Sequence, residues 1–500
     1  MKASRVAFLA AVGMIFTGAS VYSLTPAGGF GIAAEARTAE VVAGDSAAVP
    51  QPATDRPGAE LVAGTTLRVE GRLGHRTLAK GNRGETYVLL EVAGAESAGQ
   101  VRPPVNLAIV VDRSGSMKGS RLRNALQGAL TAVERLNDGD VVSVVAFDSK
   151  PQVVVPPTPI DVASRGRIRS GIQGISLGGD TCISCGIEEA LAELERTPGR
   201  VNRMIVLSDG EATAGVRDLP GFRSIAQRAA ARGTSITTIG VDVDYNERIL
   251  SAIALDSNGR HHFVANDSAL SAVFDAEARS LTTVVASDAE ASVELPPGVE
   301  LVRVVDRTFR RSGNRLTFPL GALTAGEKQT ILVQVRVPAD REGQIVVADV
   351  GVTYRDQTTG TDGRVEGKLA ADVSASGPSE LDGVVEARVN RTATADALKE
   401  ASELFKQGRV DEANRRLADR RRALDAVASV AGTKAPAPKV AQVNKDLQAQ
   451  QAVLEKAQTG FAAPPAGAAP SDPFASPVHQ SRKGKEAVKT EAEDEFKMRR

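Results

Sequence analysis

The alternation of apolar and polar positions divides the chain into segments of different character. Between residues 104 and 283, short apolar runs alternate with stretches of helical period. Strands are predicted at 105–111, 141–147, 204–207, 235–241 and 261–264, and helices at 121–136, 162–173, 184–196, 219–231, 247–255 and 269–281. This order of strands and helices predicts an α/β domain with a doubly wound, mostly parallel sheet at 104–283.

Period-two alternation replaces this pattern after the α/β block. Short strands are expected within 284–377, separated by turn sequences such as Pro296-Pro-Gly and Ser312-Gly-Asn. Regular strands of this kind predict an antiparallel β-sandwich. Two further strands at 63–103 precede the α/β block and have no partners nearby, so we expect them to pair with the downstream sandwich.

The carboxyl-terminal part is predicted to be helical and then disordered. Two apolar stripes separated by Gly408-Arg409, and a third helix to about Lys456, predict a short helical region with a hairpin at 392–458. The hairpin resembles a single tetratricopeptide repeat, which is too little for a solenoid. The segment 459–500, rich in Ala, Pro and Gly and then in charges, is expected to be disordered.

The amino-terminal segment is typical of an exported protein. Lys2 and Arg5 precede the uncharged run 6–24, and an A-x-A motif at 34–36 offers a cleavage site. Residues 1–36 are therefore predicted to be a signal peptide or a membrane anchor, and residues 37–62 a flexible linker. Either alternative places the body outside the cytoplasm, in the periplasm, at the cell surface or secreted.

Composition narrows the choice of function. Lys+Arg and Asp+Glu are both 61, so the formal net charge is zero and nothing global favours nucleic acid. The sequence has four histidines and neither an H-E-x-x-H motif nor a Ser/His/Asp order, which argues against an enzyme. Membrane contact is expected only through a retained amino-terminal anchor.

The candidate chemistry lies where the first strand of the α/β block ends. The apolar run from Val105 leads into Asp112-Arg-Ser114-Gly-Ser116. Ligands of open α/β sheets bind at the carboxyl ends of the strands, and we expect Asp112 at this solvent-facing rim. One carboxylate and two hydroxyls are hard oxygen donors that suit Mg²⁺, Mn²⁺ or Ca²⁺. The pattern therefore predicts a hard-cation site.

This motif and two others resemble the three parts of the metal-ion-dependent adhesion site of a von Willebrand factor A (VWA) domain. The others are Gly178-Gly-Asp-Thr181 and Ser208-Asp209-Gly210, and all three occur in the order of that family. The resemblance implies that the cation is surrounded, directly or through water, by Asp112, Ser114, Ser116, Thr181 and Asp209.

The resemblance extends beyond the metal residues. The segment 318–327, followed by Ile331-Leu-Val-Gln-Val, is similar to the β-region attached to A domains in bacterial proteins. These are the inter-alpha-trypsin-inhibitor-heavy-chain-like and Ca-activated-channel-like VWA proteins. In such architectures the A domain is inserted into the sandwich, which would bring the ends of the A domain close together.

The donor set indicates what a partner must supply. Two carboxylates and three hydroxyls do not close the shell of a six-coordinate ion, so we expect a protein partner to add an Asp or Glu carboxylate. The predicted function is a divalent-cation-dependent, adhesion-type protein-binding module. Two alternatives remain open: an envelope scaffold that acts through its carboxyl-terminal helices with a structural metal, and a metal-assisted hydrolase.

The only two cysteines, Cys182 and Cys185, directly follow Thr181. A pair spaced i, i+3 at the start of a helix can form a disulfide, and thiols of exported proteins tend to be oxidised. The alternative is a redox switch that moves Thr181. A metal site at this pair is disfavoured because no His or Cys completes it.

Overall fold

The computed structural model describes residues 58–81, 83–96, 103–281, 283–462 and 477–500. The predicted signal peptide or anchor at 1–36 lies outside the described residues, as does most of the predicted linker at 37–62. The end of that linker is not a linker, because strand β1 (Glu60–Ala63) pairs with the next strand and buries Leu61. Among the described residues, no helix is long and apolar enough to cross a membrane.

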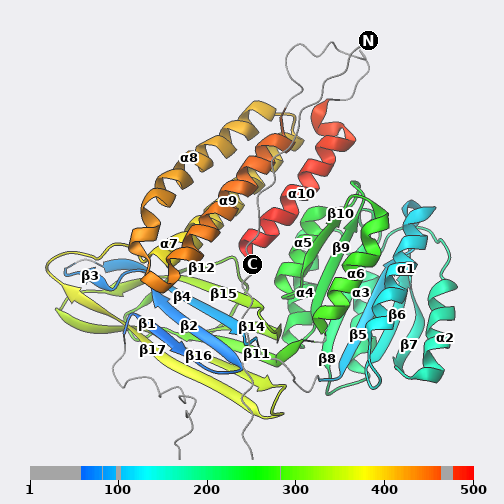
Figure 1. The fold of residues 1–500 in the computed structure, drawn as a ribbon, viewed down its shortest axis with the longest axis horizontal. Helices are drawn as coiled ribbons and strands as arrows, with labels where there is room; N and C mark the ends of the chain where they lie inside the picture. The colour runs from blue at the N-terminus through cyan, green and yellow to red at the C-terminus, as the bar shows by residue number, and fades with distance from the viewer. Residues whose placement is uncertain (1–57, 82, 97–102, 282, 463–476) are drawn as a thin grey trace, which may run out of the picture. The chain divides into compact units, whose positions relative to one another are not determined.

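The α/β domain contains a six-stranded sheet in the order β10-β9-β8-β5-β6-β7 (Figure 1). The strands are β5 (Val105–Asp112), β6 (Val141–Phe147), β7 (Pro151–Pro159), β8 (Val201–Ser208), β9 (Ser235–Val241) and β10 (His261–Val264). All neighbouring pairs are parallel except β6 and β7. Strand β7 was not predicted because it contains four prolines, which are tolerated there because β7 lies at the edge of the sheet.

Helices cover both faces of this sheet and confirm the doubly wound fold. One face packs against α1 (Ser120–Arg135), α2 (Val162–Gln173) and α6 (Leu270–Leu281); the other packs against α3 (Ile183–Glu195), α4 (Leu219–Ala231) and α5 (Glu247–Asp256). Two 3-10 turns, η1 (Gly115–Met117) and η2 (Asp267–Ala269), precede α1 and α6. Along β5, Leu107 and Ile109 face the first core, whereas Ala108 and Val110 face the second. The central strand is therefore buried on both sides.

Two antiparallel-rich sheets form the predicted β-sandwich. One has the order β1-β2-β4-β15-β12 and includes β2 (Leu67–Leu73), β4 (Arg83–Gly94), β12 (Glu300–Val305) and β15 (Lys328–Pro338). The other, in the order β13-β14-β11-β16-β17-β3, contains β3 (Thr77–Ala79), β11 (Val284–Glu294), β13 (Arg310–Ser312), β14 (Arg315–Thr324), β16 (Gly343–Asp356) and β17 (Asp362–Ser374). Because β4 precedes the α/β domain and β15 follows it, their antiparallel pairing makes the α/β domain an insertion in the sandwich.

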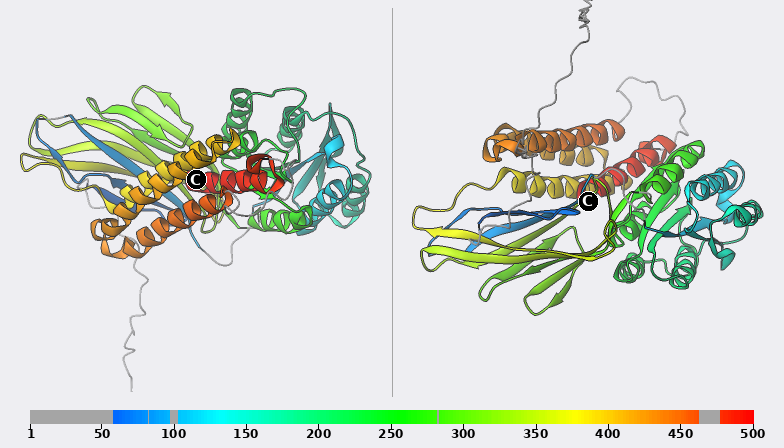
Figure 2. Two further views of the ribbon diagram at one scale, coloured as in Figure 1. Left: turned by 90° about the horizontal axis from the view of Figure 1, so that it is seen from above. Right: turned by 60° about the horizontal axis from the view of Figure 1, so that its bottom comes forward.

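A helical layer covers the outer face of the five-stranded sheet (Figure 2). It consists of α7 (Gly383–Lys406), α8 (Val410–Lys434), η3 (Ala437–Lys439), α9 (Val440–Gly460), η4 (Val478–Gln480) and α10 (Arg482–Arg499). Leu89 and Leu332 of the sheet share one core with Val385 of α7. Helix α7 begins before the predicted start at 392 because the Asp382 carboxylate caps it, accepting hydrogen bonds from the backbone N–H of Val384 and Val385.

The prediction of a disordered tail at 459–500 is wrong for residues 478–499. Helix α10 buries Val488 and Phe496, and its charged side chains bind partners far away in the sequence. Lys489 donates to the carbonyl oxygen of Tyr245 and to the carboxylate of Glu247. A segment of mixed charge looks solvated in the sequence, but here Arg482, Lys485 and Lys489 pair with carboxylates of the α/β domain.

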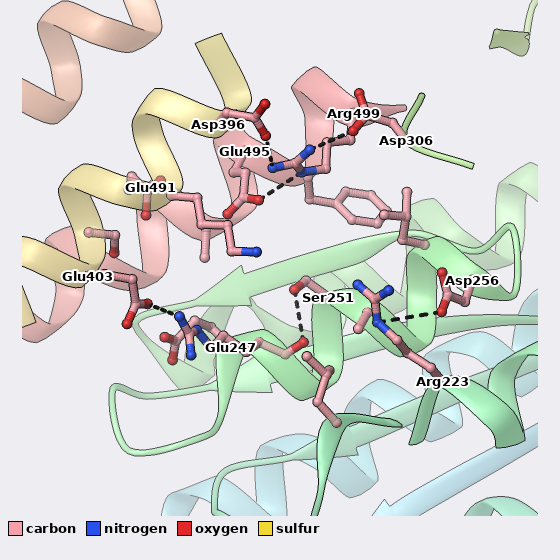
Figure 3. A pocket seen from close by; sticks show the side chains of 18 of the residues that line it. Arg223, Glu247, Ser251, Asp256, Asp306, Asp396, Glu403, Glu491, Glu495 and Arg499 are labelled. Carbon is pink, nitrogen blue, oxygen red and sulfur yellow. Dashed lines mark hydrogen bonds and ion pairs between the residues drawn. The ribbon is translucent and has the colours of Figure 1, made fainter. Parts of the chain in front are cut away.

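The junction between α5, α7 and α10 is lined by charged side chains (Figure 3). Burial alone would raise the pKa of Glu247, but the ammonium groups of Lys489 and Lys406 outweigh it and lower that pKa to about 2. Arg248 of α5 pairs with Glu403 of α7 at 2.6 Å, and Arg499 of α10 pairs with Asp396 of α7 at 2.9 Å. The pairs of Glu247 with Lys489 and Lys406, and of Arg248 with Glu403, thus join the tail to the α/β domain, and the Lys489–Glu247 pair is the one of low exposure on both sides.

We predict that Glu247→Gln destabilises the protein in a pH-dependent way. Because the folded-state pKa of Glu247 is depressed to about 2 from 4.5, the ionised carboxylate stabilises the fold fully above pH 4.5, and this contribution is lost as the pH falls through 2. The loss in unfolding free energy should be about 3 kcal/mol at pH 7 and roughly 1.5 kcal/mol at pH 3.

Urea unfolding at both pH values measures this difference. The control is Glu412→Gln, since Glu412 pairs with Arg409 at the exposed surface, where solvent screens the pair, and its loss should change the stability little at either pH. Equal destabilisation by Glu247→Gln at pH 7 and pH 3 would contradict the assignment.

Candidate metal site

Three chain segments meet at the carboxyl ends of β5 and β8. Strand β5 ends at Asp112, and β8 ends at Ser208, directly before Asp209. The segment 178–181 crosses the first loop, since the backbone N–H of Gly178 donates to the carbonyl oxygen of Arg113 at 2.7 Å and that of Gly115 donates to the carbonyl oxygen of Gly179 at 3.1 Å. The three predicted motifs are therefore adjacent in space.

Hydrogen bonds connect the carboxylates and hydroxyls of the first and third motifs. Asp112 accepts from the backbone N–H of Ser114 at 2.8 Å and from the Ser208 hydroxyl at 2.6 Å. The Ser116 hydroxyl donates to Asp209 Oδ1 at 2.6 Å and lies 3.0 Å from the Ser114 hydroxyl. Four of the five predicted ligands thus form one oxygen cluster.

Thr181 belongs to the same cluster. A β-carbon added to Gly210 would lie 3.4 Å from Ser116 Oγ and 3.8 Å from Thr181 Oγ1, so both hydroxyls lie around this glycine. Thr213 fixes the backbone of Thr181, accepting from its N–H at 2.9 Å and donating to its carbonyl oxygen at 2.9 Å. The absence of a side chain at residue 210 leaves the space between the hydroxyls open.

The two carboxylates of the cluster are buried. Asp112 is 0% exposed, which corrects the expectation of a solvent-facing rim position: the loops of the three motifs fold over the strand end. Burial, with a smaller contribution from the charge of Asp209, raises the pKa of Asp112 to about 6 despite the hydrogen bonds from Ser114 and Ser208. Burial also raises the pKa of Asp209. Two buried carboxylates of raised pKa are a site that a cation would stabilise.

The donor chemistry fits a hard divalent cation. Carboxylate and hydroxyl oxygens are the ligands that Mg²⁺, Mn²⁺ and Ca²⁺ prefer. Within the described ranges, no group of three or more His, Cys, Asp or Glu side chains is placed to hold a metal ion. The mixed set of two carboxylates and three hydroxyls is therefore the candidate metal site.

Arg121 is a further site residue, which lies outside the three sequence motifs. Its Nη1 donates to Asp209 Oδ2 at 2.9 Å and to the carbonyl oxygen of Ser116 at 3.0 Å, and its Nη2 pairs with Asp242. Asp242 in turn pairs with Arg482 of α10 at 2.7 Å. A basic residue in the first turn of α1, five positions after Ser116, is the sequence signal that could have indicated it.

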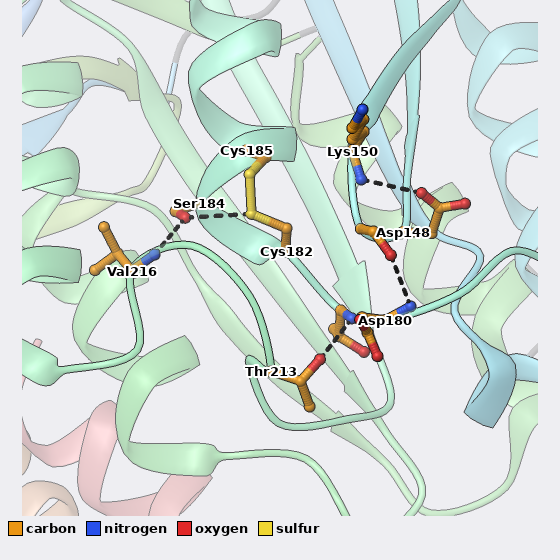
Figure 4. Close-up of a disulfide and its surroundings, with 10 residues drawn as sticks. Asp148, Lys150, Asp180, Cys182, Ser184, Cys185, Thr213 and Val216 are labelled. Atoms are coloured by element: carbon orange, nitrogen blue, oxygen red, sulfur yellow. Dashed lines mark hydrogen bonds between the residues drawn. A yellow bond between two sulfur atoms is a disulfide. The ribbon is translucent and has the colours of Figure 1, made fainter.

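Cys182 and Cys185 form a disulfide that closes the start of α3 (Figure 4). Cys182 is buried, and the Ser184 hydroxyl between the two cysteines accepts from the backbone N–H of Val216 at 3.0 Å. With the Thr181–Thr213 hydrogen bonds, this contact joins the loop of the second motif to the loop after the third. The disulfide thus lies beside Thr181 and restrains the segment that carries it.

Residues 106–276 match the family model of the von Willebrand factor type A domain. The chain is 27% identical over 272 residues to an uncharacterized protein of Synechocystis sp., 25% identical over 220 residues to the uncharacterized protein YfbK of Escherichia coli, and 26% identical over 173 residues to inter-alpha-trypsin inhibitor heavy chain H4 of Homo sapiens. These matches cover 52%, 43% and 33% of this chain. They cover 63%, 38% and 19% of the relatives, so this chain spans less than two thirds of each.

Two solved structures share the fold over most of the chain. A von Willebrand factor type A protein from Catenulispora acidiphila superposes with a TM-score of 0.65 at 18% identity and covers 81% of this chain and 91% of its own. The ArnB paralog VWA2 from Sulfolobus acidocaldarius superposes with a TM-score of 0.51 at 16% identity and covers 78% and 98%. The likeness therefore includes much more than the α/β domain.

The chain contains a VWA domain, joined to a β-sheet region and carboxyl-terminal helices. The family resemblance predicted from the three motifs is thus confirmed. Domains of this family commonly mediate interactions between proteins, generally bind rather than catalyse, and often hold a divalent metal.

We predict that Asp112→Ala abolishes Mg²⁺ and Mn²⁺ binding. Removal of one of two carboxylates leaves only Asp209 and neutral hydroxyls to offset a doubly charged ion, so the affinity should fall by at least roughly a hundredfold. Asp112→Asn should have the same effect while it keeps an acceptor for the Ser208 hydroxyl. Ser116→Ala should be milder because water can replace a hydroxyl ligand.

Calorimetric titration measures the affinities, and circular dichroism verifies the fold of each variant. An unchanged metal affinity in folded Asp112→Asn would exclude Asp112 as a ligand.

Arg121→Gln should have the opposite effect on the metal. Because the guanidinium pairs with Asp209, it competes with an ion for the same carboxylate, and its removal should raise the Mg²⁺ affinity roughly three- to tenfold. Arg123→Gln is the matched control, since Arg123 lies on the exposed face of the same helix. Equal titration curves for Arg121→Gln and Arg123→Gln would show that Arg121 does not compete.

Proposed function

We propose that this protein is a divalent-cation-dependent, adhesion-type protein-binding module of an exported or membrane-anchored protein. The observation that carries the proposal is the meeting of three separated motifs in one oxygen cluster, formed by Asp112, Ser114, Ser116, Thr181 and Asp209, in which both carboxylates are buried. The proposed cofactor is Mg²⁺, with Mn²⁺ or Ca²⁺ as substitutes.

The cluster supports a binding role because its donors leave the shell of a six-coordinate ion incomplete. An Asp or Glu carboxylate from a protein partner would add a third negative charge, whereas the cluster alone supplies two. Partner capture would then require the metal. Two features agree with this role: the family commonly mediates protein interactions, and the formal net charge of zero gives no general attraction to nucleic acid.

An extracytoplasmic location is part of the same proposal. The predicted signal peptide or anchor at 1–36 would export the body, and the disulfide between Cys182 and Cys185 agrees with an oxidising compartment. The secreted nature of inter-alpha-trypsin inhibitor heavy chains, to which part of the chain is similar, points in the same direction. Membrane contact would occur only through a retained amino-terminal anchor.

An enzymatic role has little support at this site. The four histidines of the sequence are His75, His261, His262 and His479. His261 is buried against Thr238, His262 pairs with Glu277, and His75 contacts Thr86 in the sandwich. His479 lies against Gly408 in the helical layer. A metal-assisted hydrolase would need a general base beside the ion, and none of these side chains is placed to supply it.

The scaffold alternative has one observation in its favour. Helix α8 presents exposed basic side chains at Arg415, Arg421 and Arg422, so the tail offers a surface that is independent of the metal. Deletion of the tail cannot test this alternative, because it would uncover Leu89 and Leu332 on the sheet. Substitution of the three arginines by glutamate leaves the buried contacts intact.

The proposal predicts that partner capture and metal binding are lost together. The immobilised full chain should retain a partner from envelope extract in Mg²⁺ and release it in EDTA, and Asp112→Asn should retain none in either buffer. The Arg415→Glu/Arg421→Glu/Arg422→Glu variant should behave like the wild type. Retention in EDTA by the wild type and by Asp112→Asn, with loss in the arginine variant, would instead establish the scaffold.

A further inference from the structure

A second cavity lies far from the metal site. Its volume is about 630 Å³, and it is bounded by β4, β15 and β10, by α7 and α9, and by the last turn of α10. None of the five proposed metal ligands lines it. Its wall combines buried apolar side chains with an excess of basic groups, so it has the chemistry of a ligand site of its own.

Arg388 is the buried cation of this cavity. The residue is 7% exposed, and among the described residues its guanidinium donates to backbone oxygens alone, from Nη1 to that of Met498 at 3.0 Å and from Nη2 to that of Arg499 at 2.7 Å. Its Nε has no hydrogen-bond partner in the part of the chain that the structure describes. Burial, together with the nearby charge of Arg391, lowers the pKa of Arg388 to about 10. A buried cation without a carboxylate partner is costly unless an anion joins it.

Several other basic groups around the cavity are already neutralised. Arg260 and Arg500 both pair with Glu327 of the sandwich, and Arg260 also lies 3.3 Å from Glu277. Arg391 pairs with Asp446 at 3.0 Å. The last of this set, Lys497, pairs with Glu493 at 2.8 Å. These four arginine and lysine side chains therefore contribute little net charge.

Two lysines at the rim leave an excess of positive charge. The structure places Lys328 and Lys445 on the wall, and for neither does it give an ion pair among the described residues. Lys328, Lys445 and Arg388 face one carboxylate on the wall that likewise forms no ion pair among the described residues, Glu91. Three cations facing one anion make the cavity attractive to a ligand of negative charge.

The floor of the cavity is apolar. Leu89 of β4, Val384 of α7 and Val443 of α9 belong to the core that joins the sheet to the helical layer, and Phe496 of α10 lies beside them. The cavity shown in Figure 3 differs in charge, because its wall carries seven carboxylates against six basic side chains, and many of these form ion pairs. Excess positive charge above an apolar floor therefore distinguishes the cavity at Arg388 from the cavity in Figure 3.

From this arrangement we infer that the protein binds a small amphiphilic anion here, with a carboxylate or phosphate at Arg388 and the two rim lysines and an apolar body against Leu89 and Val443. The ligand could reach the cavity free in solution or by transfer from a membrane. The inference is independent of the proposed cation-dependent function, because the two sites share no residue.

Titration of the full chain with sodium decanoate, below its micelle concentration, tests the inference. Saturable binding with one site per chain is expected, and decyltrimethylammonium should bind at least tenfold more weakly. Lys328→Gln/Lys445→Gln should weaken decanoate binding roughly tenfold, and Arg388→Gln by more. Lys150→Gln/Lys483→Gln makes the same change of net charge at exposed lysines outside the cavity and should leave the affinity unchanged.

The double variant Lys328→Gln/Lys445→Gln, here called the rim variant, still tests the inference if Arg388→Gln fails to fold. Both rim lysines are exposed, so their substitution should leave the fold intact. A second experiment compares vesicles of phosphatidylglycerol and phosphatidylcholine with vesicles of phosphatidylcholine alone. Uptake of the anionic lipid by the wild type, lost in the rim variant, would identify a membrane as the source of the ligand. Binding of monomeric decanoate without uptake of lipid would identify a soluble source. The inference is overturned if decanoate and phosphatidylglycerol both fail to bind saturably. It is also overturned if decyltrimethylammonium binds as tightly as decanoate, or if the rim variant binds decanoate as tightly as the wild type. Addition of EDTA should change none of these affinities.

Discussion

The antiparallel pairing of β4 with β15 is the contact on which the arrangement of the chain depends. It runs from Ala93 opposite Lys328 to Arg83 opposite Pro338, and the whole α/β domain lies between the two strands in the sequence. The entropic cost of closing such a long loop rises only slowly with its length, and an inserted domain that folds as a unit lowers that cost further. The same sheet provides the outer face on which α7 and the other tail helices pack.

The negative charge of two aspartates determines which ligands the carboxyl ends of β5 and β8 can bind. Parallel strands bring Asp112 and Asp209 to one edge of the sheet, and the surrounding loops bury both. Burial makes two neighbouring carboxylates unfavourable without a counter-charge. Arg121 supplies part of that charge from within the chain, and the proposed cation would supply the rest. The site is thus organised around negative charge that the fold does not fully neutralise.

Local signals in the sequence were sufficient for most elements of the α/β domain and for the motif residues. The apolar run 107–111 indicated a strand buried on both faces, and the spacing of Asp112, Ser114 and Ser116 indicated the oxygen donors. Strand β7 was missed because its prolines are unfavourable in a strand and acceptable only at an edge, which depends on the whole sheet. Arg121 escaped notice because its partner Asp242 lies 121 residues away. The order of α10 likewise depends on long-range pairs, such as Lys489 with Glu247.

The ion pairs around Asp242 connect the candidate metal site to helix α10. Arg121 divides its guanidinium between Asp209 and Asp242, and Asp242 also holds Arg482 at the start of α10. Thermodynamic linkage makes any such connection reciprocal: to the extent that an ion at Asp209 alters the docking of α10, the docking of α10 alters the affinity for the ion by the same factor. Occupancy of the site could therefore be followed from the far end of the chain, by the protection of the α10 backbone amides from hydrogen exchange.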